Sequence, residues 1–162
     1  MVRPGQPAEE LPISTGVTSR QLLDFLREHR LAVQSSVSQA SAPQAAVVGI
    51  AVTDRFEIVF DTLDSTRKAR NLRGNPHVAL VIGGLTAGDE RTAQYEGVAD
   101  VPSGEELERL TAAYYTVYPD GRSRTSWTGL IYVRVRPTWI RYSDYNVDPP
   151  LIVEFRADQL VV

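Results

Sequence analysis

The segment "GLIYVRVRP" (129–137) constrains the fold more than any other part of the sequence. Apolar residues at 131, 133 and 135 alternate with Tyr132, Arg134 and Arg136, which is the pattern of a half-buried strand. Strands of parallel sheets are buried on both faces, whereas antiparallel sheets can leave one face open. The sequence therefore favours an antiparallel sheet in which the face with Arg134 and Arg136 meets solvent or a ligand.

Short segments of strand character, joined by turns, recur along the chain. They cover residues 31–38, 44–52, 56–62, 77–84, 91–101, a continuation of the 129–137 strand to 145, and 150–155. Gly97 interrupts one of them, which indicates a bulge or a close backbone approach. Helical spacing predicts helices over 18–30, about 65–73, and 103–119, with starts at Thr18 or Ser19, at Asp64 or Ser65, and at a Ser103–Glu106 capping box. We expect an antiparallel sheet or barrel of six or seven strands with peripheral helices.

A length of 162 residues suits a single domain. We expect a loose arm over residues 1–17, which is rich in Pro, Gly and Glu, a folded domain over 18–156 and a short tail over 157–162. No apolar run approaches the roughly 18 residues that span a membrane, and no signal-peptide core is present. We therefore expect a cytoplasmic protein without membrane contacts.

The residue inventory excludes several kinds of site. The chain has no cysteine, so disulfides and thiolate metal sites are excluded. Its only histidines are His29 and His77, so the sequence does not predict a histidine metal site or a Ser-His-Asp triad. The net charge is −3 and the longest basic run is "RKAR", so the sequence does not predict nucleic-acid binding.

Arg67 and Lys68, which is the only lysine of the chain, fall in the first turn of the predicted 65–73 helix. Cations are unfavourable there, because a helix N-terminus carries partial positive charge. A solvated basic face is one interpretation. The other is a phosphate or carboxylate site, completed by free N–H groups and the hydroxyls of Ser65 and Thr66.

The segment "VFDTLDSTRKARNLRGNPHVAL" resembles the phosphate-binding segment of the pyridoxamine 5′-phosphate oxidase-like, FMN-binding split-barrel family. That family's pattern is an aromatic strand, a threonine, Ser-Arg-Lys-Ala, a leucine, and Asn-Pro before an apolar strand. The strands "QAAVVGIAV" and "TAQYEGVADV", the helix after Ser103 and the strands in "VRVRPTWIRYSDY" follow in the same order. The resemblance covers roughly residues 18–145 and implies a mainly β, α+β fold, an antiparallel six-stranded split β-barrel with peripheral helices.

The resemblance also implies the residues that bind the cofactor. Arg67 and Lys68 would hold the FMN phosphate, while Asp61 and Thr62 would line the ring or the ribityl chain. The backbone of Val47, Val48 and Gly49 would face the edge of the isoalloxazine, and Thr92 or Gln94 would make the contact of the family's glutamine. A homodimer with the cofactor at its interface is implied as well.

Two departures from the family concern the substrate. Ala46 and Ala51 stand where true pyridoxamine phosphate oxidases carry an arginine and a lysine, and their C-terminal Arg-x-His motif is missing. We expect an FMN-dependent oxidoreductase that does not oxidise pyridoxamine phosphate, without a predicted catalytic side chain. The alternatives are a deazaflavin-dependent reductase, whose acidic coenzyme tail would meet Arg70 and Arg73, and a non-catalytic flavin-binding protein.

The sequence allows two roles for each of three further side chains. Trp127 and Trp139 would either stack on a flavin or a partner, or pack in the core or an interface. Arg141 would either contact a substrate anion or form a surface ion pair.

Overall fold

The computed structural model describes residues 16–162, so the predicted arm over residues 1–17 lies almost entirely outside the described part. Three α-helices and two short 3-10 helices occur in this part, together with eight strands. The helices are α1 (Ser19–Glu28), α2 (Arg67–Gly74), α3 (Gly104–Val117), η1 (Pro119–Ser126) and η2 (Ala157–Gln159). The strands are β1 (Leu31–Val37), β2 (Pro43–Gly49), β3 (Ala51–Val52), β4 (Ile58–Leu63), β5 (His77–Gly83), β6 (Arg91–Asp100), β7 (Leu130–Asp144) and β8 (Leu151–Arg156).

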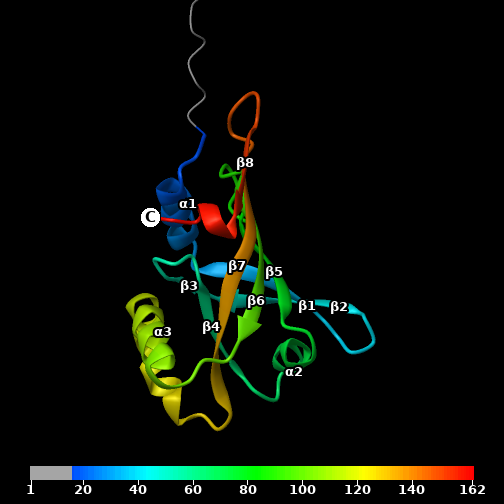
Figure 1. Cartoon of the computed structure of the whole chain (residues 1–162), viewed down its shortest axis with the longest axis vertical. Helices are drawn as coiled ribbons and strands as arrows, with labels where there is room; N and C mark the ends of the chain where they lie inside the picture. Colours follow the sequence, from blue (N-terminus) through cyan, green and yellow to red (C-terminus); the bar gives the residue numbers. More distant parts are fainter. Residues whose placement is uncertain (1–15) are drawn as a thin grey trace, which may run out of the picture.

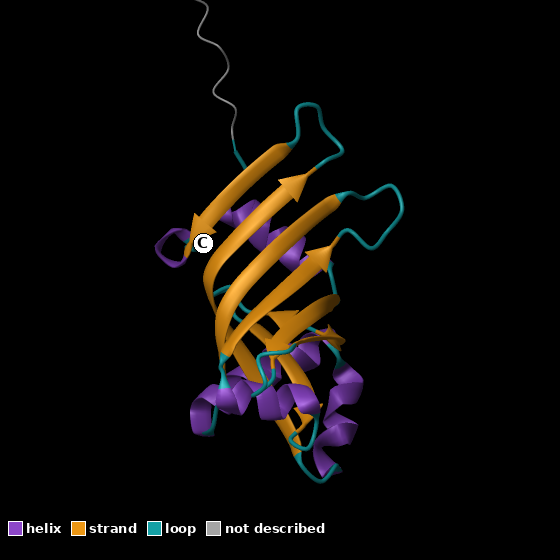
Figure 2. Ribbon diagram, turned by 90° about the vertical axis from the view of Figure 1, so that its right-hand side faces the viewer, coloured by secondary structure: helices purple, strands orange, loops and turns teal. Residues whose placement is uncertain are grey.

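All the strands belong to one antiparallel sheet, in the order β2-β1-β5-β6-β7-β4-β3, with β8 also paired to β7. The sheet curls into a half-barrel, with α3 beside its lower end and α2 next to the β1–β2 hairpin (Figures 1 and 2). The predicted antiparallel split barrel with peripheral helices is confirmed. None of the helices in residues 16–162 has the length and apolar character needed to cross a membrane.

The strand number differs from the predicted six because the 44–52 segment divides at Ile50. Up to Gly49 the chain pairs with β1, and from Ala51 it pairs with β4. The buried Ile50 side chain and its N–H bond to the carbonyl of Arg30 fix the bend between the two pairings. The 150–155 segment is a full member of the sheet as β8.

Strand β7 joins the two halves of the barrel. Its first half pairs with β4 and its second half with β8, while β6 runs along its other edge. A bulge interrupts the β6–β7 register, where Glu96 pairs with Trp139 and Gly97 with Pro137. A Cβ at Gly97 would lie 2.4 Å from the carbonyl oxygen of Arg136, so the close approach predicted at Gly97 is confirmed.

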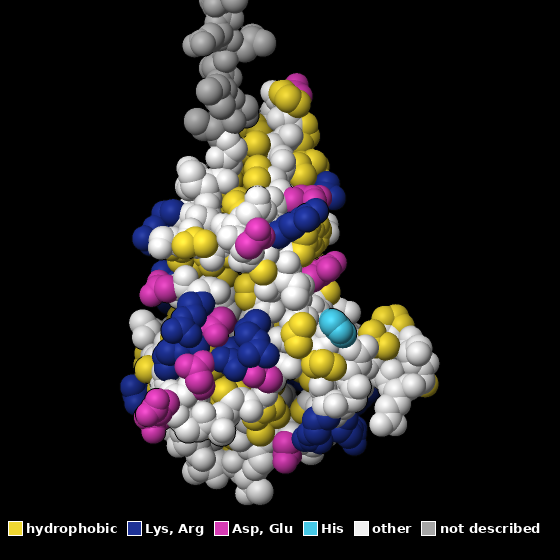
Figure 3. Space-filling view, in the orientation of Figure 1, with side chains coloured by type: hydrophobic (Ala, Val, Ile, Leu, Met, Phe, Trp, Pro, Cys, Tyr) yellow, Lys and Arg dark blue, Asp and Glu magenta, His cyan; other side chains and the backbone are white. Residues whose placement is uncertain are grey.

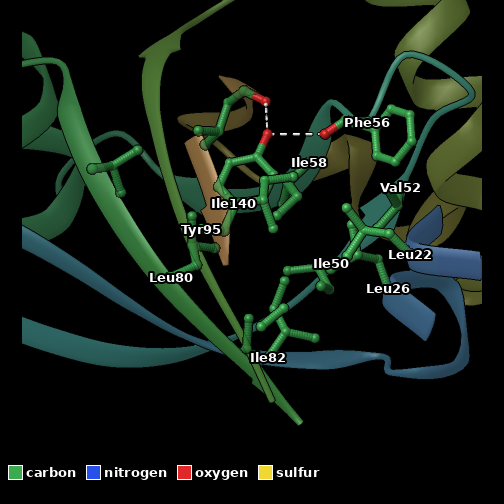
Figure 4. Close-up of a cluster of buried hydrophobic side chains, with 14 of the residues drawn as sticks. Leu22, Leu26, Ile50, Val52, Phe56, Ile58, Leu80, Ile82, Tyr95 and Ile140 are labelled. Carbon is green, nitrogen blue, oxygen red and sulfur yellow. Dashed lines mark hydrogen bonds between the residues drawn. The ribbon is translucent and has the colours of Figure 1, made fainter. Parts of the chain in front are cut away.

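The core lies between the curled sheet and α1, whose apolar stripe is buried as predicted. Thr18 and Gln21 form a capping box at the start of this helix. Tyr95 is fully buried in the core, and its hydroxyl donates to the carbonyls of Phe56 and Val135, both at 2.9 Å (Figure 4). A second apolar cluster lies between α3 and the opposite face of the sheet. It contains Ala51, Val59, Leu110, Tyr114 and Tyr132.

The face that carries Arg134 is not open, contrary to the sequence prediction. Arg134 is only 9% exposed, and its guanidinium contacts Asp100 at 2.6 Å and Glu106 at 2.6 Å. Because Glu106 takes part in these ion pairs, the predicted capping box with Ser103 does not form. The prediction was wrong because the start of α3 brings carboxylates over this part of the strand. Arg136 remains exposed, as expected.

Candidate functional site

Helix α2 begins as the sequence predicted, with Arg67 and Lys68 in its first turn. Its N-cap is Thr66 rather than Asp64 or Ser65, because a turn closed by the Thr66 N–H and the Leu63 carbonyl delays the helix. The Thr66 hydroxyl accepts from the N–H of Ala69 at 3.3 Å. No hydrogen bond within residues 16–162 uses the N–H of Arg67 or Lys68, so two donors stay available at the helix start.

A hydroxyl chain holds Lys68 in place. Its Nζ donates to Thr62 Oγ1 at 3.3 Å, and this hydroxyl lies 3.1 Å from that of Thr66. Asp64 does not neutralise these cations. Its carboxylate lies against Gly129 instead, and within the described residues it forms no ion pair.

The start of α2 forms one wall of a cleft of about 430 Å³, and the β1–β2 hairpin forms the other. Its lining residues are Gln34, Ser36, Gln44, Ala45, Ala46, Ser65, Thr66, Arg67, Lys68 and Arg70. Arg67, Lys68 and Arg70 have no carboxylate partner in the part of the chain that the structure describes. The cleft therefore combines three uncompensated cations with free N–H groups, which is the chemistry of an anion site.

The floor of the cleft is polar, which sequence reasoning missed. The Asn71 amide donates to Ser36 Oγ at 3.1 Å and to Gln44 Oε1 at 3.0 Å. Gln34 lies beside them and is 1% exposed. Gln34, Ser36 and Gln44 lie on the β1–β2 hairpin, whereas Asn71 comes from α2, which is 27 to 35 residues away along the chain from its partners.

A larger cleft of about 600 Å³ lies between α1, β3 and α3, and two of its three arginines, Arg27 and Arg109, already have carboxylate partners. Arg27 pairs with Asp54 at 2.7 Å, and Arg109 pairs with Glu57 at 2.9 Å. The α2 cleft is therefore the better candidate for a ligand site despite its smaller volume.

The predicted cofactor residues of β2 and β4 are distributed over several environments. Val47, Val48 and Gly49 follow the cleft residues on β2, which is the edge strand of the sheet. The Val48 side chain is buried, whereas Val47 points outward, and a Cβ at Gly49 would lie 2.9 Å from the Tyr118 hydroxyl. Only the backbone of these three residues can therefore face a ligand along the open strand edge.

Thr62 and Asp61 face opposite sides of β4. Thr62 contacts Lys68, whereas Asp61 lies on the side of α3. There its carboxylate accepts from the Tyr114 hydroxyl and from Arg124 Nε, both at 2.9 Å. Burial and the neighbouring Asp61 carboxylate raise the pKa of Tyr114 above its ordinary value, which keeps its hydroxyl protonated as a donor. In this structure Asp61 is part of a tyrosine–arginine cluster and does not line the α2 cleft.

Thr92 and Gln94 lie on the outer face of β6, two strands away from β1 and three from β2. Within one chain they do not reach the α2 cleft. Gln94 pairs across the sheet with Arg141, whose buried Nε has no hydrogen-bond partner in the described residues. Trp139 lies on the same outer face, and Trp127 is exposed after η1.

Comparisons of the whole fold find related split barrels that bind different cofactors. A heme binding protein from Mycobacterium smegmatis superposes with a TM-score of 0.75 at 16% identity, over 99% of this chain and 61% of that protein. The heme storage protein HutZ from Vibrio cholerae gives a TM-score of 0.64 at 15% identity, over 73% and 88% of the two chains. A pyridoxamine 5′-phosphate oxidase-related, FMN binding protein from Nostoc punctiforme gives 0.62 at 11% identity, over 85% and 84%.

These identities show a shared fold, and the chain spans only about three fifths of the length of the M. smegmatis protein. No curated protein sequence matches the chain significantly. The family model described as pyridoxamine 5′-phosphate oxidase matches residues 18–144, which confirms the resemblance seen in the segment around Arg67. The chain belongs to the pyridoxamine 5′-phosphate oxidase family.

Proposed function

We propose that this protein binds FMN in the α2 cleft and is an FMN-dependent oxidoreductase that acts as a homodimer. The observation that carries the proposal is the set of three cations, Arg67, Lys68 and Arg70, which lack carboxylate partners in the described residues. The relative from Nostoc punctiforme is an FMN binding protein of the same fold, which supports the choice of ligand.

A phosphate suits the start of α2 better than a neutral group does. The helix dipole and two free N–H groups favour an anion at this end, and each charge-assisted hydrogen bond contributes about 1.5–3 kcal/mol. Two such bonds outweigh the roughly 0.3–1 kcal/mol that each cation costs at a helix N-terminus. The amide nitrogen of Gln34 is buried and has no hydrogen-bond partner among the described residues, so it is a further donor without a partner beside the cleft.

Arg67 and Lys68 would hold the phosphate, with Thr62 and Thr66 orienting Lys68. The open edge of β2 would offer backbone groups to the isoalloxazine. Bound FMN supplies the redox chemistry, so the protein need only bind, orient and shield it. Ala46 lines the cleft and Ala51 is buried under α3, so neither offers a cation for a pyridoxamine phosphate substrate.

The outer face of the sheet supports the homodimer. Leu31, Val47 and Val81 are exposed there on three adjacent strands, and Val47 is 62% exposed. Contiguous exposed apolar side chains mark interaction surfaces. A second copy on this face would cover them, and it would bring a ligand within reach of Gln94 and Arg141.

A deazaflavin coenzyme is the second candidate, because the cleft continues past the phosphate site. An adjoining hollow of about 330 Å³ shares Gln44, Arg67 and Arg70 with the cleft and reaches the β1–β2 turn. An acidic tail could lie there beside Arg70. Arg73 would not take part, because it donates to the carbonyl of Asp64 and lines a separate pocket.

The absorption spectrum of the purified protein tests the cofactor class, and titration with FMN and riboflavin tests the phosphate site. We expect flavin bands and at least about a hundredfold tighter binding of FMN than of riboflavin. Equal affinity for the two flavins would contradict the phosphate site, a deazaflavin spectrum would favour the second candidate, and a Soret band would indicate heme. Turnover with a reduced nicotinamide would distinguish an enzyme from a flavin carrier.

A further inference from the structure

Gln34 is a buried polar residue without a partner at the floor of the α2 cleft. It lies in the middle of β1 and is 1% exposed. Its Nε2 has no hydrogen-bond partner within the described residues. Buried amide donors are normally paired, because a buried donor without a hydrogen-bond partner lowers the stability of the fold.

The sheet register shows that the fold itself does not need a polar side chain here. The residues paired with Gln34 are Leu80 on β5 and Ala46 on β2, and both are apolar. A side chain of similar length without polar atoms would therefore suit the position as well.

The other polar groups of the floor do not offer Gln34 an acceptor. Ser36 and Gln44 each accept from Asn71, and neither oxygen forms a hydrogen bond with Gln34 Nε2. Ala46 is small, so the space between Gln34 and the wall with Arg67 and Lys68 belongs to the cleft. Within the described residues, the unmatched donors around this space include the Gln34 amide, the cations Arg67, Lys68 and Arg70, and the N–H groups at the start of α2.

We propose that Gln34 is a ligand-binding residue whose amide N–H donates to an oxygen of the phosphoribityl arm of FMN. This inference rests on the proposed function. The acceptor is either a phosphate oxygen or a ribityl hydroxyl, and both present the same lone pairs to an amide. Gln34 gives the site a neutral donor on β1, across the cleft from the cations of α2.

The test compares the parent protein with Gln34→Met and Gln34→Glu, each freed of flavin. The Met variant keeps the length of the side chain but has no donor, and the Glu variant keeps the shape and replaces the donor with a carboxylate. Fluorescence titration gives the affinity for FMN and for riboflavin, and thermal unfolding of the flavin-free proteins gives their stability.

We expect Gln34→Met to bind FMN about 10- to 100-fold more weakly. Its flavin-free form should melt at least as high as the parent, because a buried unpaired amide has been removed. Where the acceptor is a phosphate oxygen, Gln34→Glu should bind FMN more weakly still, since its carboxylate then faces the phosphate, and the loss should shrink at acidic pH as the carboxyl becomes a donor. A residue with a purely structural role would not produce weaker binding together with unchanged or higher stability.

The riboflavin titrations identify the acceptor. Weakened binding of FMN alone assigns a phosphate oxygen, and an equal loss for both flavins assigns a ribityl hydroxyl. Unchanged FMN affinity in both variants would overturn the role of Gln34 while leaving the proposed function intact. A parent without preference for FMN would overturn the phosphate site, yet weaker binding of both flavins by the variants would still support Gln34. A parent that binds neither flavin would overturn both proposals.

Discussion

The molecule has two groups of cationic side chains beside the sheet, one at α3 and one at the start of α2, and they differ in whether carboxylates neutralise them. Beside α3, Arg109 and Arg134 alternate with the carboxylates of Glu57, Asp100 and Glu106. Figure 3 shows blue and magenta side chains intermixed over this part of the surface, whereas a blue group lies at α2. In the α2 cleft, the cations have no carboxylate partner among the described residues.

The matched region, with Arg109 and Arg134 beside carboxylates, contributes to folding. The unmatched region, which is the α2 cleft, is available to a ligand. Burial acts to raise the pKa of Glu57, but the hydrogen bonds from Arg109 and Thr53 outweigh it and hold the pKa below its ordinary value. A buried charge of this kind is tolerated only with its partners in place. The number of arginines in a region therefore does not show whether it can bind an anion. What distinguishes the two regions is whether the fold places carboxylates beside the arginines.

The largest effect on the unmatched side is expected from replacing both Arg67 and Lys68 by Ala. Removing two charge-assisted contacts should weaken FMN binding by about 3–6 kcal/mol, or roughly a hundredfold to more than ten thousandfold. The melting temperature of the flavin-free protein should change little or rise, because cations at a helix start are unfavourable. Arg73→Ala is the matched control and should bind FMN normally, because Arg73 points away from the cleft. If the double variant binds FMN as tightly as the parent, the cations form only a solvated face.

On the matched side, Arg134→Met should destabilise the fold without affecting the α2 cleft. It removes the closest partner of Asp100, which among the described residues keeps only Arg136 at 3.7 Å, and one of the two arginines beside the buried Glu57, which keeps Arg109. Complete loss of a partner costs about 3–5 kcal/mol in buried pairs, so we expect a destabilisation of up to about this size. Urea denaturation measures the loss, and FMN titration of the folded variant should match the parent. Arg136→Met serves as the control, because Arg136 lies 3.7 Å from Asp100 and is 53% exposed. A loss as large for Arg136→Met as for Arg134→Met would remove the distinction between buried and exposed pairs.

Acidification should produce a smaller effect in the same region, since protonation removes a charge but leaves the side chain in place. The hydrogen bond from Arg109 lowers the pKa of Glu106 from 4.5 to about 2, and that from Arg134 lowers the pKa of Asp100. A carboxyl whose pKa is lower in the folded state stabilises the fold above its unfolded pKa, and this contribution is lost as the pH falls toward 2. The urea midpoint should therefore decrease between about pH 4.5 and pH 2, and Arg134→Met should show a weaker decrease. Equal pH dependence in parent and variant would contradict this assignment.

Local features of the fold could be predicted from the sequence because they depend on neighbouring residues. The alternation in 129–136, the capped stripe of α1 and the position of Arg67 and Lys68 in the first turn of α2 are of this kind. Arg134 was misplaced because its carboxylate partners come from β6 and α3, which are distant along the chain. No residue pattern within 129–137 predicts these carboxylate partners.

The floor of the cleft could not be predicted for a related reason. In β1 the apolar residues Leu31 and Val33 lie on the outer face, while Gln34 and Ser36 are buried. A rule that places apolar side chains inside would orient this strand the opposite way. The inversion follows from the polar cleft on one face of the strand and the proposed dimer surface on the other.

The bulge in β7 changes which residue numbers of this strand face the core. Inward positions are odd-numbered through Val133 and Val135, and even-numbered at Ile140 and Tyr142. Thr138, which is exposed, is the extra residue between Pro137, which pairs with Gly97, and Trp139, which pairs with Glu96. Its deletion would remove the bulge, so that β7 could pair continuously with β6 while Ile140 and Tyr142 still face inward. The extra residue thus shifts the numbering of the inward positions of β7 by one, while the same face of β6, with Tyr95 and Ala99, lies against the core on both sides of the bulge.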